Sequence, residues 1–203
     1  VISLSLKAVE GNDFTTAYMQ LAYEVGELYK KHEYLMESPA LNAEEKKKFG
    51  DIRYGRAGKI EVMRSLQILS EFLSRHYNKS VILLIDEYDV PMARATSNGY
   101  YKEMLEIMKG FMQALKDNQC IKFAVITGCL KIAKESIFTG TNNFASNTIT
   151  SSRLNEYYGF IQSEVDRILE DADLKGKEEV MKKWYDGYRF GDVDVYCPWD
   201  VMC

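Results

Sequence analysis

The most constraining feature of the sequence is the run VILLIDEYD at residues 81–89. Five consecutive apolar residues, Val81 to Ile85, are followed by acidic side chains at positions 86, 87 and 89. An unbroken apolar run of this length between polar neighbours is typical of a parallel strand that is buried on both faces. We therefore expect an α/β fold in which helices flank a parallel sheet.

The segments around this run support that expectation. An amphipathic helix is predicted over 100–115, and a second apolar strand follows at 121–127. Strand, helix and strand in this order predict a right-handed βαβ unit. Earlier in the chain, 1–6 alternates like a strand with one covered face, and apolar residues recur at helical spacing over 14–36 and 60–77.

The domain organisation follows from changes in pattern along the chain. Residues 1–150 are expected to form the core, in which the polar and charged stretch 39–59 is predicted to be an insertion or a mobile loop. Residues 147–150 suggest a further short strand. We expect 151–203 to form a small, lid-like helical region that ends in a hairpin near 188–196.

Composition excludes several classes of protein. With 46% hydrophobic and 28% charged residues the chain is an ordinary globular protein, and its net charge of -4 with scattered basic residues disfavours a nucleic-acid footprint. The four cysteines form no C-x-x-C pair, which disfavours a zinc site. Without a secretory segment or an apolar run of roughly 20 residues, we expect a cytoplasmic protein with reduced thiols and no membrane partner. Because the first residue is Val1, we interpret the chain as an excised or processed fragment.

Candidate site residues gather where the two strands end. In an open parallel sheet, the loops at the carboxyl ends of the strands form the ligand crevice. An apolar strand followed by Asp-Glu is the Walker B arrangement, in which Asp86 accepts a magnesium-bound water and Glu87 polarises the water that attacks a terminal phosphate. Two acids in a solvated turn or helix cap are the alternative interpretation.

Further candidates follow the second strand. Thr127 stands at the tip, where a sensor residue bonds the terminal phosphate or the attacking water, although a simple turn would look the same. Lys131 and Lys134 come next and are candidates for phosphate contact, or else solvated helix charges. The role of Asp89 is not evident.

Several strings make the sequence resemble the bacterial AAA-ATPase-like family. They occur in the family's order along nearly the whole chain: LIDEYDVP (84–91), LKDN (115–118), FAVITGCLKIAKESIFTGTNN (123–143), YGF (158–160), WYDGYRFG (184–191) and PWD (198–200). The resemblance implies an additional-strand P-loop NTPase fold, often fused to a PD-(D/E)XK nuclease-like domain, that binds ATP with Mg²⁺ and hydrolyses it. It also implies that Asp86 and Glu87 are the Walker B acids and Thr127 the sensor. Lys131 stands where the family has arginine, which retains the charge but not bidentate phosphate contact.

The sequence departs from the family in two segments. It contains no phosphate loop of the form G-x-x-x-x-G-K-[ST], because the Gly-Lys pairs at 58–59 and 176–177 lack both the first glycine and the hydroxyl residue. It also contains no nuclease-like domain, through which alone nucleic acid would be a partner. We therefore interpret the chain as a partial P-loop NTPase that carries the Walker B and sensor half of an ATP site and binds nucleotide weakly. The sensor strand is expected to pair with 147–150 or to be covered by another chain, including by self-association.

Two other functions remain open from sequence alone. The chain is alternatively a degenerate, nucleotide-independent interaction module that recruits a partner through an exposed sheet edge. A metal-dependent nuclease that uses Asp86, Glu87 and Asp89 is less favoured, because the E-x-K spacing at 44–46 lies in a polar stretch with no strand to present it.

Overall fold

A computed structural model describes residues 1–116, 118–129 and 145–203. The chain forms two compact units, Val1–Asn142 and Asn143–Cys203. Each unit is described by itself.

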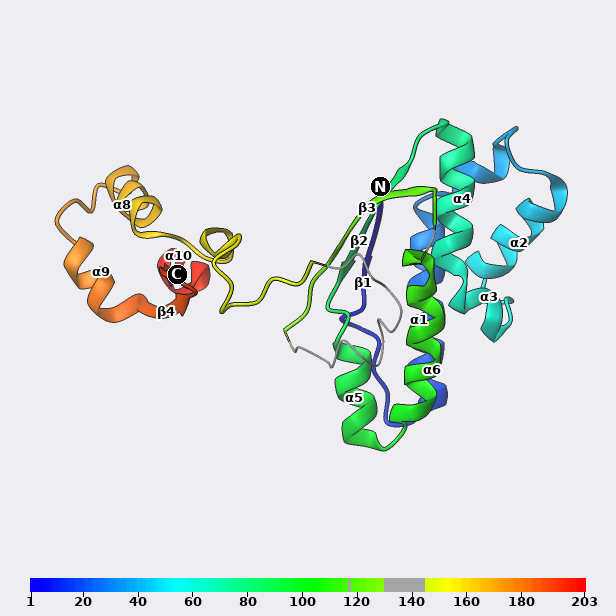
Figure 1. The fold of residues 1–203 in the computed structure, drawn as a ribbon, viewed down its shortest axis with the longest axis horizontal. Helices are drawn as coiled ribbons and strands as arrows, with labels where there is room; N and C mark the ends of the chain where they lie inside the picture. The colour runs from blue at the N-terminus through cyan, green and yellow to red at the C-terminus, as the bar shows by residue number, and fades with distance from the viewer. Residues whose placement is uncertain (117, 130–144) are drawn as a thin grey trace. The chain divides into compact units, whose positions relative to one another are not determined.

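The first unit is built on a parallel sheet of three strands, β1 (Ile2–Ser5), β2 (Val81–Asp86) and β3 (Ile121–Ile126). The strands lie in the order β1-β2-β3, with Leu4 opposite Ile85 and Leu84 opposite Val125. The predicted α/β class with parallel strands is confirmed, and β2 is the central strand (Figure 1).

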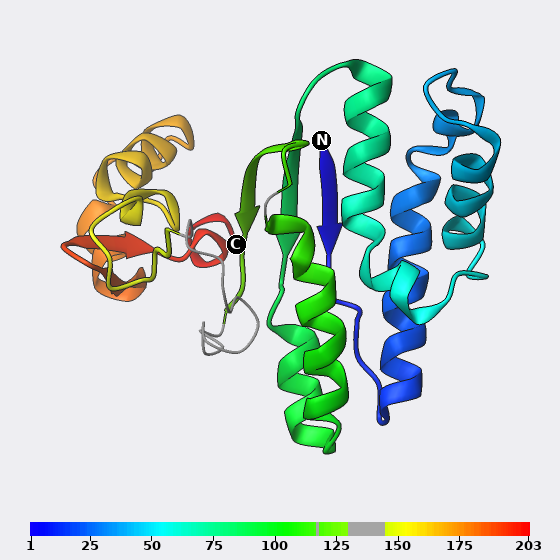
Figure 2. The ribbon, with the colours of Figure 1, turned by 45° about the vertical axis from the view of Figure 1, so that its right-hand side comes forward.

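The helices that connect these strands lie along one face of the sheet. Because β1, β2 and β3 follow one another in the same direction, right-handed crossovers place every connection on the same side. Figures 1 and 2 show α1, α4 and α6 there. The helical elements are α1 (Phe14–Lys30), η1 (Glu33–Glu37), α2 (Ala43–Arg53), α3 (Lys59–Met63), α4 (Ser65–Tyr77), α5 (Val90–Asn98), α6 (Tyr101–Met112) and η2 (Gln113–Leu115).

The central strand is not buried on both faces, which corrects the sequence-based expectation. Its burial alternates: Leu83 is fully buried against the helices, whereas Ile82 and Leu84 on the other face are 37% and 36% exposed. On β3, Phe123 and Val125 continue this surface and are 59% and 39% exposed. We call these four side chains the open apolar face. It is open because α1, α4 and α6 lie on the opposite side of the sheet (Figures 1 and 2).

The stretch 39–59 contains helix α2, so the predicted loop is wrong for 43–53, whereas the helical pattern predicted from 60 onward agrees with α3 and α4. Phe49 and Ile52 of α2 are buried in the core, and the Phe49 ring lies 4.8 Å from that of Tyr29 on α1. Phe49 and Ile52 are the only large apolar residues of α2, and most of its other positions are charged. For this reason hydrophobic periodicity did not identify it.

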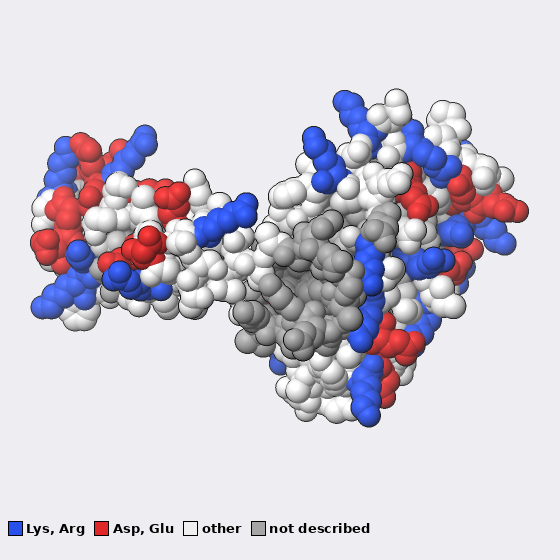
Figure 3. Space-filling model, in the orientation of Figure 1, with Lys and Arg blue, Asp and Glu red and all other residues white. Residues whose placement is uncertain are grey.

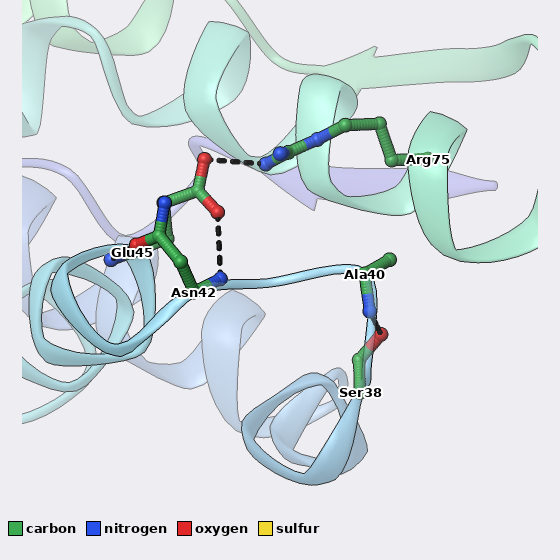
Figure 4. Close-up of polar contacts among 5 residues, drawn as sticks. All are labelled: Ser38, Ala40, Asn42, Glu45 and Arg75. Carbon is green, nitrogen blue, oxygen red and sulfur yellow. Dashed lines mark hydrogen bonds and ion pairs between the residues drawn. The ribbon is translucent and has the colours of Figure 1, made fainter.

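Polar contacts fix the start of α2 to the end of α4 (Figure 4). The Asn42 side chain accepts a hydrogen bond from the Glu45 N–H at 2.9 Å. The Glu45 carboxylate in turn accepts one from the Asn42 N–H, also at 2.9 Å. Arg75 of α4 donates to the other oxygen of Glu45 at 2.7 Å. This bond to Arg75, with that from Asn42, lowers the pKa of Glu45. In the segment that precedes α2, Ser38 Oγ accepts a hydrogen bond from the Ala40 N–H at 3.2 Å.

The second unit contains the predicted helical region and hairpin. Its antiparallel hairpin covers a small core of Val165, Leu169 and Tyr196. The predicted strand at 147–150 is wrong. That segment is turn and coil, and the Ile149 carbonyl accepts the Gly191 N–H beside the hairpin at 2.8 Å. The elements are η3 (Asn155–Tyr157), α8 (Gln162–Asp171), α9 (Glu178–Tyr185), β4 (Asp186–Phe190), β5 (Val193–Tyr196) and α10 (Pro198–Met202).

Two observations bear on partners. Within the described residues of the first unit β3 pairs only with β2, so its other edge is a sheet edge there. Among the described helices, none combines the length and the apolar character needed to cross a bilayer.

Candidate functional site

The turn that follows β2 converts the strand into helix α5 within a few residues. β2 ends at Asp86, and Glu87 adopts the left-handed backbone conformation with φ 54°. The Tyr88 N–H then donates to the Thr127 carbonyl at 3.1 Å, which ties the turn to the end of β3. Asp89 precedes the first residue of α5, and its carbonyl accepts the Ala93 N–H at 2.9 Å.

Asp86 and Thr127 lie side by side at the carboxyl edge of the sheet. Ile85 of β2 pairs with Ile126 of β3, and the Thr127 N–H donates to the Ile85 carbonyl at 2.9 Å. The next residue of each strand, Asp86 on β2 and Thr127 after β3, is therefore adjacent to the other. The Thr127 hydroxyl donates a hydrogen bond to Oδ1 of Asp86. The structure thus brings together the predicted metal ligand and the predicted sensor.

On the other side of Asp86 lies a residue that sequence reasoning missed. Ser5 of β1 is the register partner of Asp86, and the Leu6 N–H donates to the Asp86 carbonyl at 2.9 Å. In the sequence, Ser5 is visible only as a polar position of the alternating segment 1–6. Its place beside Asp86 cannot be predicted, because the register between two strands cannot be read from one strand. Ser5, Asp86 and Thr127 therefore form a polar row across the sheet edge.

Gly128 is the second residue whose role was missed. A Cβ at this position would lie 2.5 Å from Oδ1 of Asp89 and 2.7 Å from the Tyr88 ring. Asp89 is 3% exposed, so its carboxylate is packed in this turn and cannot serve as a solvent-facing metal ligand. A glycine directly after a strand is a signal for close backbone approach, but it does not identify the approaching group.

The remaining predicted site residues have different outcomes. Glu87 is half-buried beside Asp86, whereas Lys131 and Lys134 lie outside the described residues. The described residues contain no group of three or more His, Cys, Asp or Glu side chains that could hold a metal ion. A single exposed carboxylate such as Asp86 fits Mg²⁺, which commonly binds through one or two carboxylates, waters and the phosphates of its substrate.

Fold and site together define an α/β protein in which the central strand of a parallel sheet ends in an acidic pair beside a threonine. Residues 1–138 match the family model described as "Predicted AAA-ATPase" (AAA-ATPase-like). The chain belongs to this AAA-ATPase-like family.

The chain is also similar to an uncharacterised protein in the vnfD 5' region of Azotobacter chroococcum mcd 1. The two are 29% identical over 125 residues, which cover 60% of this chain and 24% of that protein. The match thus spans about a quarter of that relative. No solved structure gave a significant match.

Proposed function

We propose that this chain is part of an ATP-binding, ATP-hydrolysing protein and carries the Walker B and sensor half of its site. The observation that carries the proposal is the placement of Asp86 and Glu87 at the carboxyl end of the central strand, beside Thr127. Asp86 would hold Mg²⁺, directly or through a bound water, and Glu87 would orient and polarise the attacking water. Bound Mg²⁺ would neutralise charge that develops on the transferred phosphoryl group.

The open apolar face and the edge of β3 indicate where the phosphate-binding half would attach. A strand that belongs to this half would come before β1 in the sequence and would pair with the outer edge of β3. The connection from it to β1 would then run across the sheet in the opposite sense to the connections from β1 to β2 and from β2 to β3. Its right-handed crossover would place the connecting helix on the open apolar face. The N-terminus of that helix would then lie at the same sheet edge as Asp86, where its free N–H groups bind phosphate. We propose that residues outside 1–203 supply this strand and helix.

Calorimetry with Mg-ATP tests the half-site proposal. Since most phosphate contacts would come from the absent loop, residues 1–203 alone should bind Mg-ATP more weakly than micromolar. Micromolar binding by this chain would contradict the division of the site.

An interaction module that does not use nucleotide is the second candidate, and the open apolar face favours it. Parallel sheets are normally covered on both faces, and exposed Phe123 beside a sheet edge is a surface for association. A stable oligomer in size-exclusion chromatography, combined with no detectable Mg-ATP binding, would favour this function over the first.

A metal-dependent nuclease has less support. Asp89 is buried, and basic and acidic side chains are interspersed on the visible face of each unit (Figure 3). Metal-dependent cleavage of DNA that is lost in Asp86→Ala would establish this activity instead.

A further inference from the structure

We propose that Thr127 is a positioning residue for the Asp86 carboxylate and does not donate to a terminal phosphate. This inference rests on the proposed magnesium site at Asp86. A threonine hydroxyl carries a single hydrogen, and here that hydrogen is donated to Oδ1 of Asp86. The same hydroxyl therefore cannot donate to a phosphate oxygen while the bond to Asp86 persists.

The backbone around Thr127 holds its hydroxyl in place. The Thr127 N–H donates to the Ile85 carbonyl at 2.9 Å, and the Thr127 carbonyl accepts the Tyr88 N–H at 3.1 Å. These bonds attach Thr127 to the residue before Asp86 and to a residue shortly after it. The hydroxyl and the carboxylate are consequently presented by one hydrogen-bonded frame, so their contact does not depend on a flexible loop.

The other neighbour of Asp86 gives a matched comparison. Ser5 occupies the equivalent position on β1, but its hydroxyl oxygen accepts the Lys7 N–H at 3.3 Å. The polar row thus contains a hydroxyl residue on each side of Asp86. The hydroxyl that is described as donating to the Asp86 carboxylate is that of Thr127.

A hydrogen bond to one oxygen of a metal-binding carboxylate restricts the rotation of that group. Such outer contacts fix ligand orientation, and their removal typically weakens metal binding by about 10-fold or more. Thr127 therefore acts on the metal through Asp86.

Paramagnetic Mn²⁺, used without nucleotide, is the probe for this role. Mn²⁺ titrated into the ¹⁵N-labelled 203-residue chain should broaden the amide signals around residues 86 and 127. Thr127→Val keeps the shape of the side chain but removes the hydroxyl, and it should require about 10-fold more Mn²⁺ for equal broadening. Thr127→Ser should restore the wild-type response. Ser97→Ala, which removes an exposed hydroxyl that donates to the Ala93 carbonyl within α5, should leave the response unchanged.

The possible outcomes separate this inference from the proposed function. If Thr127→Val responds like the wild type while Asp86→Asn loses the broadening, the metal site stands and the positioning role is overturned. If the wild type shows no broadening at this edge, or if Asp86→Asn retains it, the metal site at Asp86 and the inference that rests on it both fail. Amide spectra without Mn²⁺ verify that every variant is folded.

Discussion

Glu87 occupies a backbone conformation that side chains with a Cβ rarely adopt. Its φ of 54° lies in the left-handed region, where glycine is favoured, yet the position carries a long acidic side chain beside Asp86. Local strain of this kind concentrates at functional sites, because the surrounding hydrogen bonds impose it. The conformation is therefore consistent with a side chain retained for chemistry.

The strain at Glu87 predicts a measurable stability difference. Glu87→Gly should be more stable than Glu87→Ala by about 1 kcal/mol, because only glycine adopts this φ without a steric penalty. Urea denaturation of the two variants, which both lack the carboxylate, measures this difference. Equal stability would show that the turn is not strained in solution.

At Gly128, replacing the glycine with alanine should destabilise the protein. A methyl group at this position would collide with the Asp89 carboxylate and the Tyr88 ring, so Gly128→Ala should lower the free energy of unfolding by about 1–3 kcal/mol. Gly50→Ala is the control, because a Cβ there meets only the end of Arg56 at 3.8 Å in the interior of α2. That variant should be stabilised by about 0.5–1 kcal/mol. Destabilisation by Gly50→Ala, or none by Gly128→Ala, would contradict the packing described.

At the scale of elements, polar contacts at the start of α2 add to the narrow apolar face that Phe49 and Ile52 provide. The pKa of Glu45 is lowered by the bond from Arg75 and by the Asn42 N–H. A carboxyl group whose pKa is lower in the folded state contributes stability above its unfolded pKa, and this contribution is lost as the pH falls through the folded value.

Glu45→Gln tests this contribution. Glutamine retains the capping geometry but loses the charge that faces Arg75, so the variant should be about 0.2–1 kcal/mol less stable at pH 7. The difference should shrink as the pH falls below about 4.3, where Glu45 becomes neutral in the unfolded and then in the folded chain. Urea denaturation at neutral and acidic pH checks this, and a pH-independent difference would contradict the assigned cause.

The open apolar face and the edge of β3 predict self-association of the isolated chain. Phe123→Lys places a charge on this face and should shift the chain toward monomer in size-exclusion chromatography with light scattering. Tyr23→Lys is the control, because Tyr23 is also exposed but lies on α1. A wild-type chain that is monomeric at high concentration would contradict the prediction.

At the scale of the whole molecule, local patterns predicted much of the fold. The parallel strands and the hairpin follow from runs and alternations that each segment carries by itself. The open apolar face did not follow, because an unbroken apolar run does not reveal on which side the crossovers fall. The helix at 43–53 was also missed, since its stability comes partly from Arg75, which lies far away in the sequence.

As with the fold, only part of the candidate site could be predicted from the sequence. Asp86, Glu87 and Thr127 were identified because a motif and two strand ends are visible in the sequence. Ser5 required the register between β1 and β2, and Gly128 required knowledge of the side chains that pack against it.

The acidic pair after β2 is proposed to hold Mg²⁺ and to activate the attacking water during ATP hydrolysis by the full-length protein. Phosphate release by that protein, compared between wild type and Glu87→Gln, tests it most directly. The account predicts that the variant still binds Mg-ATP while hydrolysis falls by about 100-fold or more, since a positioned general base is lost. Undiminished hydrolysis by Glu87→Gln would contradict the account.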